Sequence, residues 1–137
     1  MQADKPGAAM PQCPFCEMSP DRVLAEEGPC ALISDLYPVA PGHALIIPRR
    51  HISSFREMTP DEWAATHRLA QKRGAELQAE DPSIQGFNLG INDGRAAGQT
   101  IPHCHIHLLP RRTGDVRRPE GGVRGVIPSK ARYGQLD

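Results

Sequence analysis

The chain has 137 residues, and its 16 Lys and Arg balance 16 Asp and Glu to a formal net charge of zero. This length predicts one domain that buries roughly two thirds of its unfolded surface. Zero net charge excludes a protein that coats polyanions, so we expect no nucleic-acid partner. No run approaches the ~20 apolar residues of a membrane span, so we expect no membrane partner either.

The N-terminal residues and the cysteines bear on location. Residues 1–5 lack the basic and then apolar layout of a secretory signal peptide, which predicts a cytoplasmic protein. In that reducing compartment the four cysteines are expected to be thiols or metal ligands rather than disulfides. Residues 1–12 are rich in Gly, Ala and Pro, and we expect this N-terminal segment to be disordered.

Turn residues separate five short apolar segments that we interpret as strands. These segments are 22–26, 30–35, 43–48, 86–92 and 105–109. The third ends at Pro48, which cannot donate to a strand ladder. Because the strands follow one another along the chain and one helix is inserted, the order predicts an antiparallel meander in an α+β domain.

The inserted helix is expected over residues 60–79. Thr59 supplies an N-cap, Pro60 opens the first turn, and Glu62 stands three residues after the cap. The dipeptide Asp81-Pro82 ends the helix. A stripe at helical spacing is expected to face the core: Trp63, His67, Ala70, Gly74 and Leu77.

Three histidines alternate along residues 102–109. In a strand, alternate side chains share a face, so His103, His105 and His107 are expected to line one surface while the residues between them pack on the other. An imidazole near neutral pH can accept, donate or ligate a metal. Three imidazoles on one face therefore predict a functional site rather than a core.

A turn from Asn92 to Thr100 leads directly into the histidine segment. Gly98, Gln99 and Thr100 can direct main-chain N–H groups, an amide and a hydroxyl at one anion. Taken alone the segment indicates only a turn, but its place before three aligned histidines predicts a phosphate cradle. A neutral imidazole beside such a cradle can attack phosphorus while the donors stabilise charge on oxygen.

Two segments resemble the histidine triad (HIT) superfamily. Residues 98–109 are similar to its His-φ-His-φ-His-φ-φ signature, with Cys104 where an aliphatic residue is usual, and residues 35–51 are similar to its ribose-site segment. The resemblance covers residues 13–112. It implies a HIT-like α+β fold with a five-stranded antiparallel sheet, one long helix and one short helix, followed by a C-terminal extension over residues 113–137.

The resemblance also implies roles for individual residues. The middle histidine, His105, is expected to attack the α-phosphorus of a nucleotide and form a nucleotidyl-histidine intermediate, which water then hydrolyses. His107 would help the leaving group depart, Asp35 would accept from the ribose hydroxyls, and His43 would support the histidine network. The other nucleotide contacts that the family implies are Phe15, Met18, Ile33, Leu36, Asn92, Gly98, Gln99 and Thr100.

The function implied by the family is hydrolysis of purine nucleotides at the α-phosphate, with dinucleoside polyphosphates or nucleoside phosphoramidates as substrates. The motifs leave Fhit-type and Hint-type specificity open. A purine-nucleotide-binding regulator with little turnover is the alternative. The family further implies a homodimer, and the segment Gly121 to Pro128 is expected to fold back over the partner subunit.

Cys13 and Cys16 form a CxxC pair with two possible interpretations. A thioredoxin-type redox pair would follow a strand and open a helix, whereas this pair follows a Gly- and Pro-rich segment. A tetrahedral zinc site needs two more ligands, and His51 and His103 are available. Some bacterial HIT proteins and the related galactose-1-phosphate uridylyltransferases carry histidines at these two positions. The resemblance therefore implies a structural zinc with four protein ligands.

Overall fold

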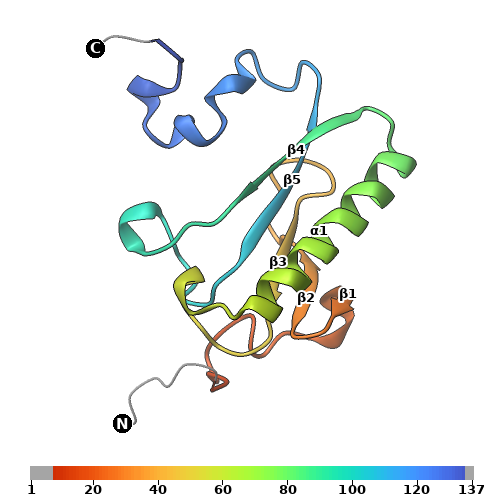
Figure 1. Ribbon diagram of the computed structural model, residues 1–137, viewed down its shortest axis with the longest axis vertical. Helices are drawn as coiled ribbons and strands as arrows, with labels where there is room; N and C mark the ends of the chain where they lie inside the picture. The colour runs from red at the N-terminus through yellow and green to blue at the C-terminus, as the bar shows by residue number, and fades with distance from the viewer. Residues whose placement is uncertain (1–7, 135–137) are drawn as a thin grey trace.

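A computed structural model describes residues 8–134, and its centre is a five-stranded antiparallel sheet (Figure 1). The strands are β1 (Val23–Glu27), β2 (Cys30–Ser34), β3 (Ala44–Pro48), β4 (Ile84–Gly90) and β5 (Ile106–Arg112). All five predicted strands are present, with ends shifted by a few residues. The predicted α+β class is confirmed.

The strand order is β1-β2-β3-β5-β4, so the sheet is not the simple meander that the chain order predicted. The last strand lies between β3 and β4, with Ile106 opposite Ile46 and Leu108 opposite Leu89. Burial explains why β5 rather than β4 lies next to β3. Alternate side chains of β5 are buried, whereas β4 is mostly half-buried or exposed and suits the edge of the sheet. The strand that carries His107 is therefore paired on both sides.

Different parts of the chain cover the two faces of the sheet. On one face, Leu32 of β2 and Ile46 of β3 pack against the long helix. On the other face, Ile33 and Ile47 pack against the N-terminal segment that carries Phe15. Because neighbouring residues of a strand point to opposite faces, β2 and β3 are apolar almost throughout.

The long helix is α1 (Pro60–Glu80), close to the predicted range. The Thr59 hydroxyl accepts from the Glu62 N–H and the Glu62 carboxylate accepts from the Thr59 N–H, so the predicted capping box is present. Where the resemblance implied one short helix, residues 8–134 contain several short 3-10 helices. These are η1 (Pro20–Arg22), η2 (Phe55–Glu57), η3 (Arg95–Ala97), η4 (Pro119–Val126) and η5 (Pro128–Lys130).

The predicted inward stripe of α1 is wrong at two positions. Trp63 is 41% exposed and His67 is also exposed, whereas Glu62 and Leu69 face the sheet. Burial of the Glu62 carboxylate is tolerated because the Arg50 guanidinium donates two hydrogen bonds to it, at 2.8 and 3.0 Å. Because consecutive helical residues point about 100° apart, a buried Glu62 leaves the neighbouring Trp63 on the outside of the helix.

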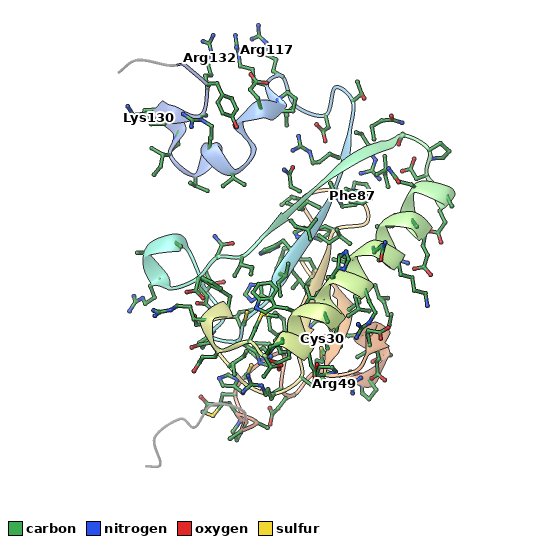
Figure 2. All side chains as sticks on the ribbon, viewed as in Figure 1. Cys30, Arg49, Phe87, Arg117, Lys130 and Arg132 are labelled. Carbon is green, nitrogen blue, oxygen red and sulfur yellow. The ribbon has the colours of Figure 1, made fainter. Side chains whose placement is uncertain are left out.

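Two contacts hold α1 close to the sheet, and Figure 2 labels the sheet residue of each. The Cys30 thiol donates to the Glu62 carbonyl at 3.5 Å. The ring of Phe87, from β4, packs over Gly74, where an added Cβ would meet the ring at 3.5 Å. The helix therefore lies across the whole sheet and contacts all five strands (Figure 2).

Both ends of the chain lie outside the sheet. The C-terminal extension continues beyond β5, past the outer ends of β4 and β5 (Figure 1), and its Arg124 guanidinium lies 4.7 Å from the Tyr133 ring centroid. At the other end, the Met10 carbonyl accepts from the Cys13 N–H. Met10 also packs on the apolar cluster that Phe15 forms with Ile33 and Ile47, which we call the N-terminal cluster. Residues 1–7 lie outside the described range, and the expected disorder of residues 1–12 stays a prediction. No helix within residues 8–134 has the length and apolar character needed to cross a bilayer.

Candidate functional site

The three histidines lie on the face of the sheet opposite α1. The ring centroids of His103 and His105 lie 5.6 and 5.2 Å from that of Phe15, and those of His105 and His107 are 5.4 Å apart. Cys104, between them, points the other way into the cluster beneath α1. The predicted alternation is therefore present, although the regular strand begins only after His105.

His105 has its ring fixed by main chain and by packing. Its Nδ1–H donates to the carbonyl of His103 at 2.7 Å. A neutral imidazole has one N–H, so this bond leaves the lone pair of Nε2 free. Phe15 contacts the same ring edge-on, at an interplanar angle of 70°. His105 therefore presents the unprotonated nitrogen that a nucleophile requires.

A second hydrogen-bonded chain sets the tautomer of His107. The Val39 N–H donates to His43 Nδ1 at 3.1 Å, so neutral His43 carries its proton on Nε2. That Nε2–H lies 2.9 Å from Nδ1 of His107, which accepts it. His107 consequently carries its own proton on Nε2 and can donate it to a ligand. The protonated Nε2 also makes His43 unsuitable as a metal ligand here.

Burial keeps this pair of imidazoles neutral. Desolvation lowers the pKa of His43, against an opposing effect of the Asp35 carboxylate. Desolvation, together with the neighbouring His105 and His43, also lowers the pKa of His107. Both rings therefore stay uncharged at neutral pH, and the tautomers set by the hydrogen bonds persist.

Asp35 lies just after β2, within reach of the same chain. Its Oδ1 accepts from the Tyr37 N–H at 2.8 Å, and its Oδ2 lies 3.3 Å from His43 Nε2. A carboxylate has further lone pairs, so Asp35 can also accept from a ligand hydroxyl. The adjacent Leu36 is 65% exposed, whereas Ile33 is fully buried in the N-terminal cluster. Of the expected apolar contacts, Leu36 thus offers the most surface to a ligand.

The CxxC pair and two histidines converge from separate parts of the chain. The donor atoms of Cys13, Cys16, His51 and His103 all lie within 4.8 Å of one another. Three sulfur–nitrogen pairs are 3.3, 3.5 and 3.6 Å apart. Zinc bonds of about 2.3 Å to sulfur and 2.0 Å to nitrogen place tetrahedral S and N ligands roughly 3.5 Å apart. The four side chains therefore fit a tetrahedral zinc ion.

The environment of His103 supports the same conclusion. Its Nε2–H donates to the Pro48 carbonyl at 2.7 Å, which orients the ring and leaves the Nδ1 lone pair toward the thiols. Desolvation lowers the pKa of His103, so its imidazole is neutral. A neutral, oriented imidazole is the form that binds a metal.

The loop before the histidines uses two of the expected phosphate contacts internally. Gln99 Oε1 accepts from the Gly94 N–H at 2.8 Å, and Gln99 Nε2 donates to the carbonyls of Ser53 and Ile101. Asn92 also turns inward, since its Nδ2–H donates to a carbonyl of the same loop. These amides hold the loop in shape. Both N–H groups of Gln99 are used in this way, whereas Asn92 keeps its Oδ1 and a second N–H for a ligand.

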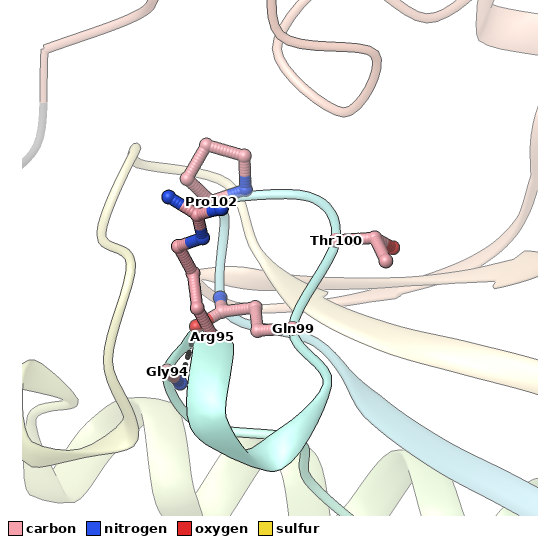
Figure 3. A pocket seen from close by; sticks show the side chains of 5 residues that line it. All are labelled: Gly94, Arg95, Gln99, Thr100 and Pro102. Atoms are coloured by element: carbon pink, nitrogen blue, oxygen red, sulfur yellow. Dashed lines mark hydrogen bonds between the residues drawn. The ribbon is translucent and has the colours of Figure 1, made fainter.

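Gly98 and Thr100 keep a different place in this loop. Gly98 has a φ of 89°, a left-handed conformation that glycine adopts without strain, and it closes the η3 turn. Thr100 is exposed and lies next to a cavity (Figure 3). Among the side chains of this loop that are expected to contact phosphate, that of Thr100 is exposed, whereas those of Asn92 and Gln99 are half-buried.

Three groups orient the histidine rings, and the sequence did not reveal this role for any of them. The Val39 N–H and the Pro48 carbonyl are main-chain groups, and a sequence pattern carries no information about where they point. The third is the ring of Phe15, which is 6% exposed and contacts the rings of both His103 and His105, while its role as a purine contact stays a prediction. Phe15 lies between Cys13 and Cys16 in the sequence, and this position beside two predicted zinc ligands could have indicated that its ring packs near the histidines.

Comparison with known families matches residues 17–114 to the HIT domain. The chain belongs to the HIT domain family. HIT relatives from Arabidopsis thaliana include the bifunctional bis(5'-adenosyl)-triphosphatase/adenylylsulfatase FHIT, 42% identical over 84 residues, which are 61% of this chain and 46% of that protein. Adenylylsulfatase HINT3 from the same plant is 38% identical over 108 residues, 75% of this chain and 54% of that protein.

Solved HIT structures resemble the chain over most of its length. A zinc-bound histidine triad family protein from Mycobacterium smegmatis has a TM-score of 0.66 at 34% identity, covering 76% of this chain and 78% of that chain. A HIT family hydrolase from Clostridium thermocellum has a TM-score of 0.66 at 33% identity, covering 79% and 97%. The chain spans about half the length of the curated relatives it matches first.

Proposed function

We propose that the chain is a nucleotide hydrolase that cleaves at the α-phosphate of adenine dinucleoside polyphosphates or nucleoside phosphoramidates. The observation that carries this proposal is the hydrogen bond from His105 Nδ1 to the His103 carbonyl, which leaves an unprotonated Nε2 beside the N–H of His107. A nucleophile and a proton donor on neighbouring positions of one strand suit phosphoryl-type transfer.

The reaction proceeds in two steps. His105 Nε2 forms a bond to the α-phosphorus as the bond from phosphorus to the leaving oxygen or nitrogen breaks, and the Nε2–H of His107 donates to the departing atom. Water then attacks the phosphorus of the nucleotidyl-His105 intermediate as its bond to His105 Nε2 breaks, and one proton of the water passes to Nε2 of His107, which releases the nucleoside monophosphate and restores both imidazoles. The His43 chain returns His107 to its starting tautomer, because the Val39 N–H continues to occupy His43 Nδ1.

The remaining assignments concern recognition of the nucleoside. Asp35 accepts from the ribose hydroxyls, and the exposed side chain of Leu36 packs against the purine. The adenosine-containing substrates named for the relatives, a bis(5'-adenosyl)-triphosphatase and an adenylylsulfatase, support adenine as the base. Because this chain spans about half of the first of those relatives, their activities come to it only as part of this proposal.

Zinc is assigned a structural role. Cys13, Cys16, His51 and His103 supply four ligands, which would complete a tetrahedral shell without an open position for substrate. When bound, the ion contributes stability and ties the N-terminal segment to the histidine segment. A zinc-bound relative with the same fold supports this assignment.

The cellular setting is proposed on narrower grounds. The four cysteines are free thiols, which suits a reducing compartment such as the cytoplasm. A homodimer agrees with the exposed indole of Trp63 on α1 and with the position of β4 at the edge of the sheet. Sedimentation at micromolar concentration tests it, and a monomer would contradict it.

Covalent trapping tests the hydrolase proposal. Wild-type protein mixed with diadenosine triphosphate or adenosine 5'-phosphoramidate, and quenched in acid-free denaturant, is expected to carry an adenylyl group by intact mass. His105→Ala is expected to lose the adduct and turnover, whereas His67→Ala, an exposed histidine on α1, retains both. Binding of AMP without turnover of either substrate would instead favour the nucleotide-binding regulator.

A further inference from the structure

Two polar side chains of the loop before β5 are not used by the loop itself. As described above, Asn92 and Gln99 bond to main-chain groups. Asp93 is also occupied, because its carboxylate accepts from the Ser54 hydroxyl at 3.2 Å and from a main-chain N–H at 3.1 Å. Within residues 8–134, the Arg95 guanidinium and the Thr100 hydroxyl form no hydrogen bond or ion pair.

Both of these side chains line one cavity of about 500 Å³ (Figure 3). Its other lining residues are Gly94, Gln99 and Pro102, so Arg95 is the charged residue of the lining. No carboxylate lines it, and the nearby carboxylate of Asp93 is held by its own donors. A cavity with an unneutralised guanidinium and a hydroxyl attracts an anion.

The cavity belongs to the segment that delivers the histidines. The loop begins after Gly90, which lies opposite His107 in the sheet, and it ends where Pro102 joins His103. Its two ends are therefore fixed beside the triad. In the two-step reaction proposed above, the side of the α-phosphorus from which the leaving group departs is assigned to this loop, because both ends of the loop adjoin the triad.

We propose that Arg95 and Thr100 form a subsite for the anionic leaving group, namely the distal phosphates of a polyphosphate substrate. This inference rests on the proposed function and decides between its two substrate classes. A planar guanidinium donates two N–H groups to phosphate oxygens, and the hydroxyl adds a third donor. A phosphoramidate releases a neutral amine that gains nothing from Arg95, so the subsite favours dinucleoside polyphosphates.

Leaving-group selectivity tests the subsite during turnover. In Arg95→Ala, the ratio of kcat/KM for diadenosine triphosphate to kcat/KM for adenosine 5'-phosphoramidate is expected to fall at least tenfold. Arg95→Lys keeps the charge without the planar pair of donors and is expected to give an intermediate ratio. Arg117→Ala removes a positive charge from the C-terminal extension and serves as the matched control, with an unchanged ratio. An unchanged ratio in Arg95→Ala overturns the proposal.

Binding separates the subsite from the chemistry. By titration calorimetry, the wild type is expected to bind adenosine 5'-(α,β-methylene)diphosphate more tightly than AMP, and Arg95→Ala is expected to lose that advantage. If the wild type turns over neither substrate but shows this difference, the hydrolase proposal fails and the subsite stands. Equal affinities for the two nucleotides in wild type and variant overturn the subsite, whatever the turnover.

Discussion

On one face of the sheet, a 21-residue helix covers β2 and β3 with apolar side chains such as Leu69. On the other face, the short N-terminal segment covers the sheet with Phe15. Its two cysteines also lie beside the imidazoles of His51 and His103. The helix face can be stable through burial alone, but so short a segment buries too little to hold itself in place. The face that carries the four proposed zinc ligands is also the face that carries the proposed nucleophile. Loss of the proposed zinc is therefore expected to affect both the stability of the fold and the activity of His105.

The largest expected effect is loss of the metal. Cys13→Ser is expected to lower zinc content well below one per chain and to destabilise the protein by at least about 4 kcal/mol, since structural zinc contributes roughly 10–16 kcal/mol in zinc-finger peptides. Metal analysis and denaturant unfolding measure both. Cys104→Ala, a buried thiol on the helix face, is the control and retains zinc. If the wild type without zinc were as stable as the wild type with zinc, the face that carries the N-terminal segment would not depend on the metal.

Truncation on the helix face is the next largest effect. Leu69→Ala is expected to cost about 3 kcal/mol, within the 2–5 kcal/mol usual for a buried leucine. Because Leu69 packs on the opposite face from the metal cluster, zinc content should stay as in the wild type. Urea unfolding with parallel zinc analysis checks this. A drop in zinc at native conditions would mean that the faces are coupled through the strands.

A smaller effect is expected where the metal cluster meets the triad. Phe15→Leu keeps an apolar side chain but removes the ring that packs on His105, so its imidazole gains freedom. We expect kcat to fall about tenfold with little change in KM, because misorientation of a reacting group costs rate rather than affinity. Zinc content should remain near one per chain. Loss of zinc in this variant would assign Phe15 to the metal site alone.

The smallest expected effect is on the pH dependence of stability, through Asp81 at the C-terminal end of α1. Hydrogen bonds from Ser83, together with the Arg112 guanidinium, lower the pKa of Asp81 from 3.8 to about 2. Since the folded pKa is lowered, the contribution of Asp81 to stability is present above pH 4 and is lost as the pH falls toward 2. Asp81→Asn is therefore expected to unfold with a weaker pH dependence between pH 4 and 2. Equal slopes for wild type and variant, measured by urea titration, would contradict this.

Local patterns were enough to predict much of this molecule. The period of two in the histidine segment predicted which side chains face the site, and Thr59 with Glu62 predicted the start of α1. Both depend on residues a few positions apart, so the sequence contains all the necessary information.

Features that depend on distant partners could not be predicted in the same way. The place of β5 between β3 and β4 depends on pairing across most of the chain. The exposure of Trp63 follows from the ion pair between Glu62 and Arg50, which no helical periodicity reveals. The amide of Gln99 donates to the carbonyl of Ser53, a residue far away in the sequence, and no local pattern indicates this contact.

One residue, His103, serves the site through two independent groups. Its carbonyl fixes the ring of His105, and its side chain faces the thiols. Any amino acid at that position supplies the same carbonyl. Replacement of this imidazole during evolution would therefore remove one of the four proposed zinc ligands while leaving the proton arrangement of the attacking ring intact, so a metal-free descendant of this fold can keep the same attacking imidazole.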